Sequence, residues 1–182
     1  MRLIVLIAVS TMFLLITSCK NKEKTMLLNQ IDKMQHQLDS MEDLTQQHQI
    51  DTLHLIILKI RNKIEEVRKY YIPDTIDYEV AEMMNAFKET RKALASNDKN
   101  LSKVKTSIPE VRQKLEDLSF DIENGVGSRD KYNEYVDFEK DKVARIADIL
   151  SYYIKTKDKY LTLFFELDPK IDDFINTIKD EK

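Results

Sequence analysis

The chain has 182 residues and a net charge of −3, from 29 basic and 32 acidic side chains, with only two glycines, three prolines and one cysteine. So few turn-forming residues and such interspersed charges favour long helices over strand-rich folds, and they exclude the basic stripe of a nucleic-acid-binding protein. A single cysteine excludes an intramolecular disulfide and a multi-cysteine metal site.

The N-terminus has the pattern of an export signal. Met1 and Arg2 form a short positively charged start, and residues 3–16 are almost entirely apolar. This run has the length of a signal-peptide core, whereas a helix that spans a membrane needs about 20 residues. We therefore expect residues 1–18 to be a signal peptide that is removed.

The only cysteine, Cys19, follows this run directly. Together with Ile16, Thr17 and Ser18 it resembles the lipobox of bacterial lipoproteins. The resemblance implies cleavage before Cys19, diacylglycerol on its sulfur and a further acyl chain on its amine. Several chains anchor a domain stably, because each buried CH₂ contributes about 0.8 kcal/mol. The alternatives are a plain secretory signal with an incidental cysteine, or an uncleaved anchor.

Residues 19–25 are expected to be the lipidated cysteine and a lysine-rich tether. Lys20 stands where an aspartate marks retention in the inner membrane of enteric bacteria, so the resemblance implies the outer membrane. The stretches "ITSCKNKEK" and "LLNQIDKMQHQLDSM" are similar to uncharacterised helical lipoproteins of Bacteroidetes-type bacteria. Surface-exposed members carry an acidic cluster after the cysteine. Glu23 alone is a poor version of it, which leaves the orientation open and favours the periplasmic face.

A helical bundle domain is expected over residues 26–182, and its first segment contains two sets of apolar residues at helical spacing. The sets are Leu27, Ile31, Met34, Leu38 and Met41, then Leu53, Ile57, Ile60, Ile64, Val67 and Tyr71. Because the sets are out of heptad phase, the polar residues 45–52 must contain a stutter, kink or short break. Residues 53–60 are apolar nearly all round and are predicted to be buried on more than one side.

The middle segment keeps one register of apolar positions, interrupted by Thr90 and Asn97. The positions are Ile76, Val80, Met83, Phe87, Leu94, Leu101, Val104, Ile108, Val111, Leu115, Leu118 and Ile122. Residues 95–100 have a loop-like composition, but the phase continues across them. We predict one bent helix over about 75–123. The alternative is a helical hairpin at Asn97, which would make the fold a four-helix bundle.

The last segment has the most regular pattern, with Glu139 and Lys157 as its only polar interruptions. Its apolar positions are Val136, Val143, Ile146, Leu150, Tyr153, Tyr160, Phe164, Leu167, Ile171, Phe174 and Ile178. The register passes Pro169, although an interior proline normally costs about 3 kcal/mol. We predict one helix over about 129–180 with a kink near Asp168.

Short connections separate the three segments. Pro73 ends the first, with Asp74 or Thr75 as the expected N-cap of the next, and "NGVGS" ends the second, with Ser128 as N-cap. Three long segments with such connections fold back on one another. The sequence therefore predicts an all-α fold, an elongated antiparallel three-helix bundle with coiled-coil-like packing.

The sequence offers no constellation for catalysis or metal binding. His36, His48 and His54 lack the i, i+3 or i+4 spacing of ligands on one helix face, and no Glu-x-x-His pair of a di-iron bundle occurs. Gly125 and Gly127 are better explained by a turn than by a phosphate loop. We therefore expect no enzymatic activity, no cofactor and no metal.

Paired aromatic residues in the last segment raise the question of a partner surface. Tyr152 precedes Tyr153, and Phe164 precedes Phe165. The core of a three-helix bundle is wide enough to hold both members of each pair, and this is the interpretation we favour. The alternative is an exposed patch of Tyr152, Leu161 and Phe165 that binds a partner protein or a second copy of the chain.

Two functions fit these features. The first is a non-enzymatic, lipid-anchored envelope protein that acts as scaffold, spacer or adaptor for another envelope protein. The second is a periplasmic carrier or holdase that shelters an apolar ligand or an unfolded outer-membrane protein. The second predicts a cavity lined by Met83, Met84, Phe87 and Phe164.

Overall fold

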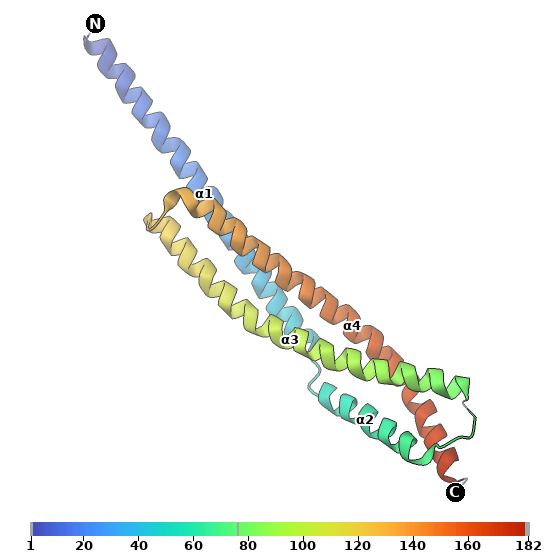
Figure 1. Ribbon diagram of the computed structural model, residues 1–182. Coiled ribbons are helices and arrows are strands. Elements are labelled where there is room, and N and C mark those ends of the chain that lie inside the picture. Colours follow the sequence, from blue (N-terminus) through green and yellow to red (C-terminus); the bar gives the residue numbers. More distant parts are fainter. Residues whose placement is uncertain (1, 76, 181–182) are drawn as a thin grey trace. The chain divides into compact units, whose positions relative to one another are not determined.

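The computed structural model describes the backbone of residues 2–75 and 77–180 and the side chains of residues 22–75 and 77–180 (Figure 1). Its α-helices are α1 (Arg2–His48), α2 (Leu53–Tyr70), α3 (Tyr78–Asn124) and α4 (Tyr132–Asp180), and a short 3₁₀ helix, η1 (Arg129–Lys131), precedes α4. No strand occurs in the described backbone. The predicted all-α class is confirmed.

The described residues form four α-helices, the number that the alternative prediction of a four-helix bundle required. The additional break, however, lies at residues 49–52 between α1 and α2, within the stretch predicted to absorb a stutter or break. Near Asn97 the chain does not turn, because α3 continues from Tyr78 to Asn124 and includes Pro109. Likewise α4 continues through Pro169, as the uninterrupted apolar register predicted.

The chain divides into two compact units. Unit 1 comprises Met1–Asp43 and Thr106–Ile146, and unit 2 comprises Leu44–Lys105 and Ala147–Lys182. Unit 1 thus takes its helices from α1, the end of α3 and the start of α4. Unit 2 takes them from the last turn of α1, α2, the start of α3 and the rest of α4.

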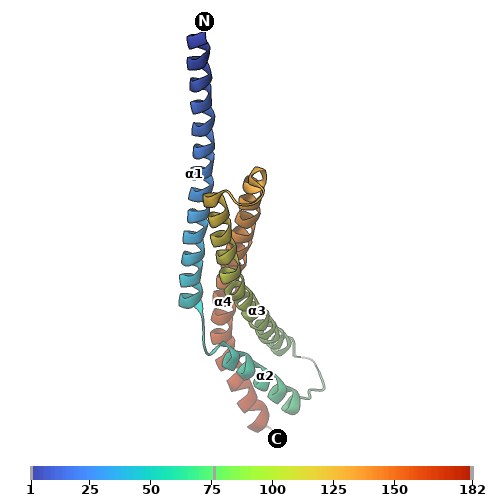
Figure 2. The ribbon, with the colours of Figure 1, turned by 90° about the vertical axis from the view of Figure 1, so that its left-hand side faces the viewer.

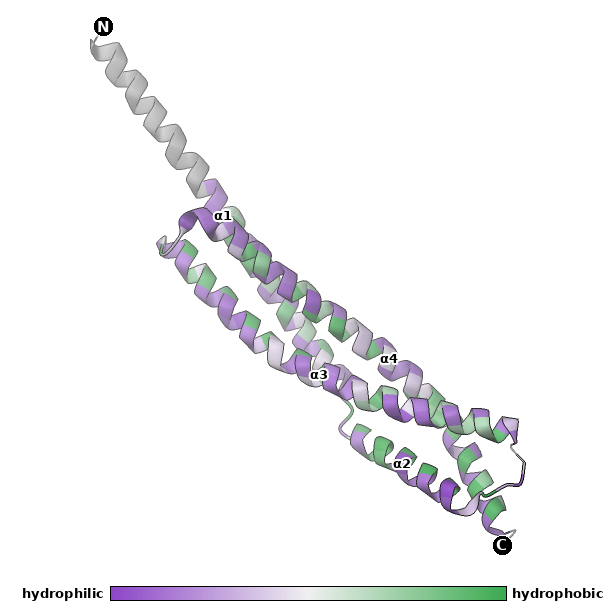
Figure 3. Cartoon of the chain, in the orientation of Figure 1, coloured by the Kyte–Doolittle hydropathy of each residue, from purple (hydrophilic) through white to green (hydrophobic). Residues whose placement is uncertain are grey.

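The core of unit 1 consists of apolar positions that the heptad pattern predicted, together with Tyr132, which precedes the predicted set of the last segment. The buried residues are Leu27, Ile31, Met34, Leu38 and Met41 on α1, Ile108, Val111, Leu115, Leu118 and Ile122 on α3, and Tyr132, Val136, Val143 and Ile146 on α4. Burying one such aliphatic side chain contributes about 1.5–3 kcal/mol. The hydrophobic residues recur as spaced bands along the helices (Figure 3).

The core of unit 2 is formed by α2, α3 and α4. Its buried members are Leu53, Ile60, Ile64, Val67, Met84, Phe87, Leu94, Phe164, Leu167, Ile171 and Ile175. The rings of Phe87 and Phe164 stack with their centroids 6.4 Å apart. Three of the residues that the carrier hypothesis placed around a cavity, Met84, Phe87 and Phe164, are therefore buried in this core.

Helix α2 lies alongside the C-terminal part of α4 in both ribbon views (Figures 1 and 2). The two helices run in the same direction, because Lys59 pairs with Asp168 and Lys179 pairs with Glu66 further along both. One prediction about α2 is wrong. The buried Leu53 and Ile60 and the partly buried Ile56 and Ile57 share one face of the helix. Leu55 and Leu58 are 52% and 48% exposed, so residues 53–60 are buried on one side and not on more than one.

Several local predictions need correction. The cap of α3 is Asp77, whose Oδ1 accepts hydrogen bonds from the backbone N–H groups of Glu79 (2.9 Å) and Val80 (3.2 Å), and not Asp74 or Thr75. Ser128 does occupy the cap position of η1, but its side chain makes no capping hydrogen bond. Met84 is buried where the register pointed to Met83, and Ile175 where it pointed to Phe174.

Candidate functional site at the α3–α4 turn

The aromatic pairs of α4 are split between core and solvent. Tyr153 and Phe164 are buried, whereas Tyr152 is 60% and Phe165 66% exposed, so the expectation that the core holds both members is wrong. Leu161 differs from the other two residues of the predicted patch, because it packs partly buried against the core of unit 2. Phe165 remains close to that core through its ring, which meets Phe164 edge-on at 5.2 Å.

The predicted lipidation site cannot be placed in the same way. The side chain of Cys19 lies outside the residues whose side chains are described, as does the apolar run before it. The nearest described side chains belong to Lys22, Glu23 and Lys24 on α1. Glu23 and Lys24 contact the turn between α3 and α4.

The α3–α4 turn is held by a dense set of hydrogen bonds. Val126 N–H donates to the carbonyl of Asp121 at 2.9 Å, and the Tyr132 hydroxyl lies 2.9 Å from that carbonyl and 2.5 Å from the carbonyl of Val126. The Arg129 Nε donates to the carbonyl of Gly125 at 2.8 Å. Because these bonds link both sides of the turn, its backbone is fixed at several points.

Both glycines of the turn are needed for their backbone angles. Gly125 has φ +66° and Gly127 has φ +79°, a region that L-residues with a Cβ rarely adopt. At Gly125 a Cβ would also collide with the Arg129 guanidinium, whereas the space around Gly127 is open. The turn is therefore built by glycine, as the "NGVGS" stretch predicted.

Two hydrogen bonds attach this turn to α1. Lys24 Nζ donates to the carbonyl of Glu123 at 2.7 Å, near the end of α3. Asn133 Nδ2, at the start of α4, donates to Glu23 Oε1 at 2.8 Å. The turn consequently lies at the level of residues 23 and 24 of α1.

A cleft of about 550 Å³ opens between these elements. Its lining residues are Glu23, Lys24, Leu27, Ile122, Glu123, Asn124, Gly125, Arg129, Asp130, Tyr132 and Asn133. The lining combines both signs of charge with only two aliphatic side chains, and it contains no histidine or cysteine. Both of its cations, Lys24 and Arg129, already donate to backbone carbonyls. The cleft is thus a polar pocket at one end of unit 1, and its lining residues include no pair of a nucleophile and a general base.

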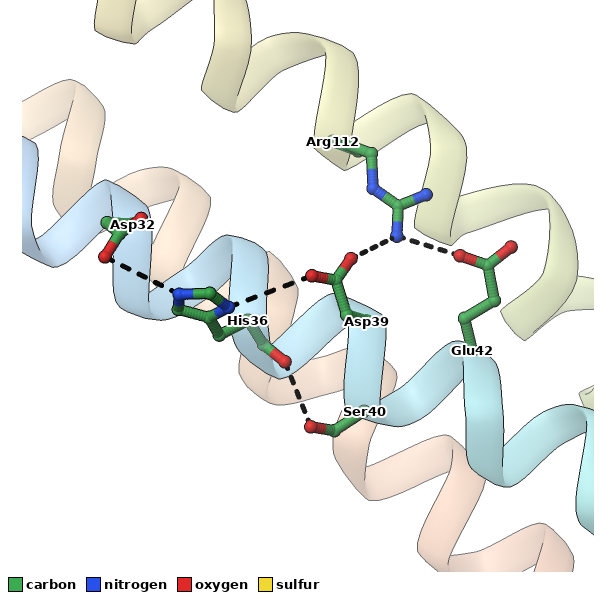
Figure 4. A network of polar contacts seen from close by, with 6 residues as sticks. All are labelled: Asp32, His36, Asp39, Ser40, Glu42 and Arg112. Atoms are coloured by element: carbon green, nitrogen blue, oxygen red, sulfur yellow. Dashed lines mark hydrogen bonds and ion pairs between the residues drawn. The ribbon is translucent and has the colours of Figure 1, made fainter.

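The histidines do not form a site either. His36 is exposed and lies 3.7 Å from Asp32 and 3.9 Å from Asp39 on its own helix (Figure 4). Asp39 also joins a contact between helices, where Arg112 Nη2 of α3 bonds both Asp39 and Glu42 of α1 at 2.8 Å. Over residues 22–75 and 77–180, no group of His, Cys, Asp and Glu could hold a metal ion.

His48 has a structural position at the break after α1. Its carbonyl accepts hydrogen bonds from the Tyr153 hydroxyl (3.0 Å) and from Lys157 Nζ (3.3 Å), and Lys157 Nζ also lies 3.0 Å from His48 Nδ1. A cation at the C-terminal carbonyls of a helix is favourable. Burial, with smaller contributions from the carboxylates of Asp98 and Asp158, raises the pKa of Tyr153 to about 12, so the phenol stays protonated and donates.

A second buried cation lies in unit 2. Lys63 is only 8% exposed in its side chain and contacts Asp168 Oδ1 and Asp172 Oδ1, each at 2.6 Å. Burial would raise the pKa of Asp168, but hydrogen bonds from Lys59 and Lys63 outweigh it and hold that pKa below its usual value. Since every charge has a partner, the cluster joins α2 to α4 and leaves no free acid or base.

The contacts of these buried polar residues were the hardest feature to predict from the sequence. Asn97 and Lys157 stood out as interruptions of the apolar register, but their partners lie more than fifty positions away in the chain. Lys63 gave no signal, because it belongs to none of the apolar sets. A polar residue in a core register marks such a contact, and only the fold identifies the partner.

No protein-family model, no curated protein and no solved structure matches this chain. Among the described residues, no helix is both long and apolar enough to cross a membrane.

Proposed function

We propose that this protein is a non-enzymatic, lipid-anchored protein of the bacterial cell envelope. Lipid on Cys19 holds it to the membrane, and its helices act as scaffold, spacer or adaptor for another envelope protein. The observation that carries the proposal is the position of the only cysteine, at the end of the apolar run 3–16 and directly after Ile16, Thr17 and Ser18. The outer membrane and its periplasmic face are the proposed location.

The scaffold role is supported by how the charged residues of the helices are used. Arg112, Lys63 and Lys179 each bond carboxylates of a neighbouring helix, and Lys157 caps the end of α1. Ionisable groups used in this way stabilise helix packing and are not available for acid–base chemistry. This pattern favours a structural protein over an enzyme.

We further propose that the helices form an elongated antiparallel three-helix bundle with coiled-coil-like packing. The support is the 3,4 spacing of the buried residues, which runs along α3 and α4 over 47 and 49 residues. Small-angle scattering of the delipidated protein should give a maximum dimension well above that of a compact 182-residue domain. A compact particle would contradict the proposal.

Partner binding is proposed for the exposed aromatic residues of α4. Tyr152 and Phe165 are each more than half exposed, and large exposed aromatics are common in interface centres. Crosslinking in native membranes should capture one defined envelope protein or a second copy of the chain. Loss of that product in a Tyr152→Ser/Phe165→Ser variant would assign the surface. The control is Phe138→Ser, because Phe138 is an equally exposed aromatic residue of α4 outside this pair.

The anchor is tested by fractionation of cells. The wild-type protein should be recovered with the membranes and the Cys19→Ala protein in the soluble fraction, with unchanged helix content by circular dichroism. Ser18→Ala is the matched control, because a small residue before the cysteine keeps the lipobox intact. A Cys19→Ala protein that stays with the membranes would remove the proposal.

A further inference from the structure

We propose that the α3–α4 turn of unit 1 rests on the surface of the membrane that holds the acyl chains of Cys19. The contact is made by a turn surface consisting of Phe120, Val126 and Tyr135. This inference rests on the proposed lipid anchor and adds to it a second, non-covalent contact between the protein and the bilayer.

Chain length limits how far the turn can lie from the anchor. The hydrogen bonds from Lys24 to Glu123 and from Asn133 to Glu23 place the turn at the level of residues 23 and 24. Only four peptide units separate Cys19 from Glu23. Because an extended chain covers at most about 3.6 Å per residue, this separation is about 14 Å or less for any conformation of the residues between.

The thickness of the headgroup layer shows that this distance is short enough for the turn to contact the bilayer surface. A bilayer is about 40–45 Å thick including its headgroups and about 30 Å thick in its hydrocarbon core, so each headgroup layer extends roughly 5–8 Å. The acylated sulfur lies at the inner boundary of that layer, because its chains fill the core. The end of unit 1 that carries the turn therefore lies within or directly above the headgroups.

The residues at this end suit such a surface. Phe120 is 61%, Val126 48% and Tyr135 41% exposed. Val126 lies in the α3–α4 connection, Phe120 four residues before the last residue of α3, and Tyr135 three residues after the first of α4. The Val126 N–H bond to the carbonyl of Asp121 keeps Val126 next to the last turn of α3, where Phe120 lies. Tyrosine is enriched at membrane–water interfaces. Phenylalanine and aliphatic side chains form the apolar face of helices that lie in this boundary.

Electrostatic attraction to anionic lipid does not explain a contact between this turn and the membrane. Lys24 and Arg129 donate to backbone carbonyls, and acidic residues such as Glu123 and Asp130 stand beside them. A mixed set of charges gives little net attraction to anionic lipid. The contact is accordingly assigned to the apolar side chains on a turn that its hydrogen bonds already hold in place.

A fluorescent probe on the turn tests the contact. Acylation uses the Cys19 sulfur, so V126C provides the only free thiol in the mature, acylated protein. The labelled protein is reconstituted in phosphatidylethanolamine–phosphatidylglycerol vesicles that contain a lipid with a nitroxide headgroup. The control is S40C on α1, which is exposed in the same unit and lies 16 residues, or about 24 Å, further along the helix from Lys24.

The V126C probe should show blue-shifted emission and strong quenching by the nitroxide lipid, and the S40C probe should show neither. The non-acylated C19S/V126C protein should also remain unquenched, because the anchor brings the turn to the bilayer. Equal quenching at V126C and S40C in vesicle-bound, acylated protein would overturn the contact and leave the anchor standing. Absence of lipid on Cys19 in the purified protein would overturn both.

Discussion

Asn97 is a polar residue in the middle of an apolar register, and it is only 1% exposed. Its Nδ2 donates to the carbonyl of Tyr153 at 2.8 Å, but its Oδ1 has no hydrogen-bond partner. An unsatisfied buried acceptor costs about 1–3 kcal/mol. Such residues in helical bundles lower stability while they favour one alignment of the helices.

Replacing Asn97 by leucine should therefore stabilise the protein. The Asn97→Leu variant removes the unsatisfied oxygen, adds apolar burial and leaves the Tyr153 carbonyl inside α4, so we expect unfolding to require about 1–2 kcal/mol more. Urea denaturation followed by circular dichroism measures the change. The control is Thr90→Val, because the buried Thr90 hydroxyl already bonds the carbonyl of Ala86 and its loss should be nearly neutral. A destabilised Asn97→Leu protein would contradict this assignment.

Asp168 makes stability depend on acid. Its pKa in the folded protein lies below the ordinary aspartate value of 3.8, so the carboxylate stabilises the fold above that pH and loses this contribution as the pH falls through the folded pKa. The Asp168→Asn variant should be less stable than wild type by about 2 kcal/mol at neutral pH, and this difference should shrink below pH 3.8. Urea unfolding over a pH series provides the measurement.

The matched control for Asp168 is Glu166→Gln. Glu166 pairs with Lys170 on the same helix at 3.1 Å, and both side chains are more than half exposed. Exposed pairs of this kind contribute roughly 0–1 kcal/mol, so this variant should differ little from wild type at any pH. A loss of stability in Asp168→Asn that is the same at neutral and acid pH would show that the loss is not electrostatic.

At the scale of the elements, periodicity was a better guide than local composition. The loop-like residues 95–100 and both interior prolines lie inside continuous helices, because the apolar register continues across them. Caps were harder to predict. Asp77 has the same chemistry as Asp74, and the sequence gives no reason to prefer one of two aspartates three residues apart. Which aspartate caps α3 depends on the path of the connection after α2.

The α3–α4 turn offers a direct comparison of its two glycines. Alanine at either position carries the penalty of a left-handed backbone, about 1–2 kcal/mol. Gly125→Ala should cost more than Gly127→Ala, because its Cβ also displaces the Arg129 guanidinium, whereas the space at Gly127 is open. Thermal unfolding of the two variants measures the difference.

The contribution of Arg129 can be separated in the same experiment. In an Arg129→Ala background, the steric conflict at Gly125 is absent and only the backbone penalty remains at both positions. The two alanine substitutions should then have equal effects. An excess cost at Gly125 that persists without Arg129 would show that another contact restricts this position.

At the scale of the whole molecule, the sequence predicted the helical class, the connections and most of the core. The two compact units left no mark in the sequence, because the registers of α3 and α4 run through both of them. The polar stretch 45–52 did indicate a break, but not how His48, Tyr153 and Lys157 stabilise it. Contacts between distant positions depend on which helices become neighbours, and that information is not local.

The central claim concerns how the chain is attached to the cell. We propose that Cys19 is cleaved and acylated, which would fix the location of the protein and place the α3–α4 turn at the bilayer surface. The proposed anchor rests on the apolar run and on the residues before Cys19, and residues 20–25 of α1 connect Cys19 to the rest of that helix.

Mass spectrometry of the protein purified from its native membranes tests this claim most directly. We predict an N-terminal peptide that begins at Cys19 and carries a diacylglyceryl group on sulfur, with a further acyl chain on the amine. A peptide that begins at Met1, or a cleaved N-terminus with an unmodified cysteine, would contradict the account.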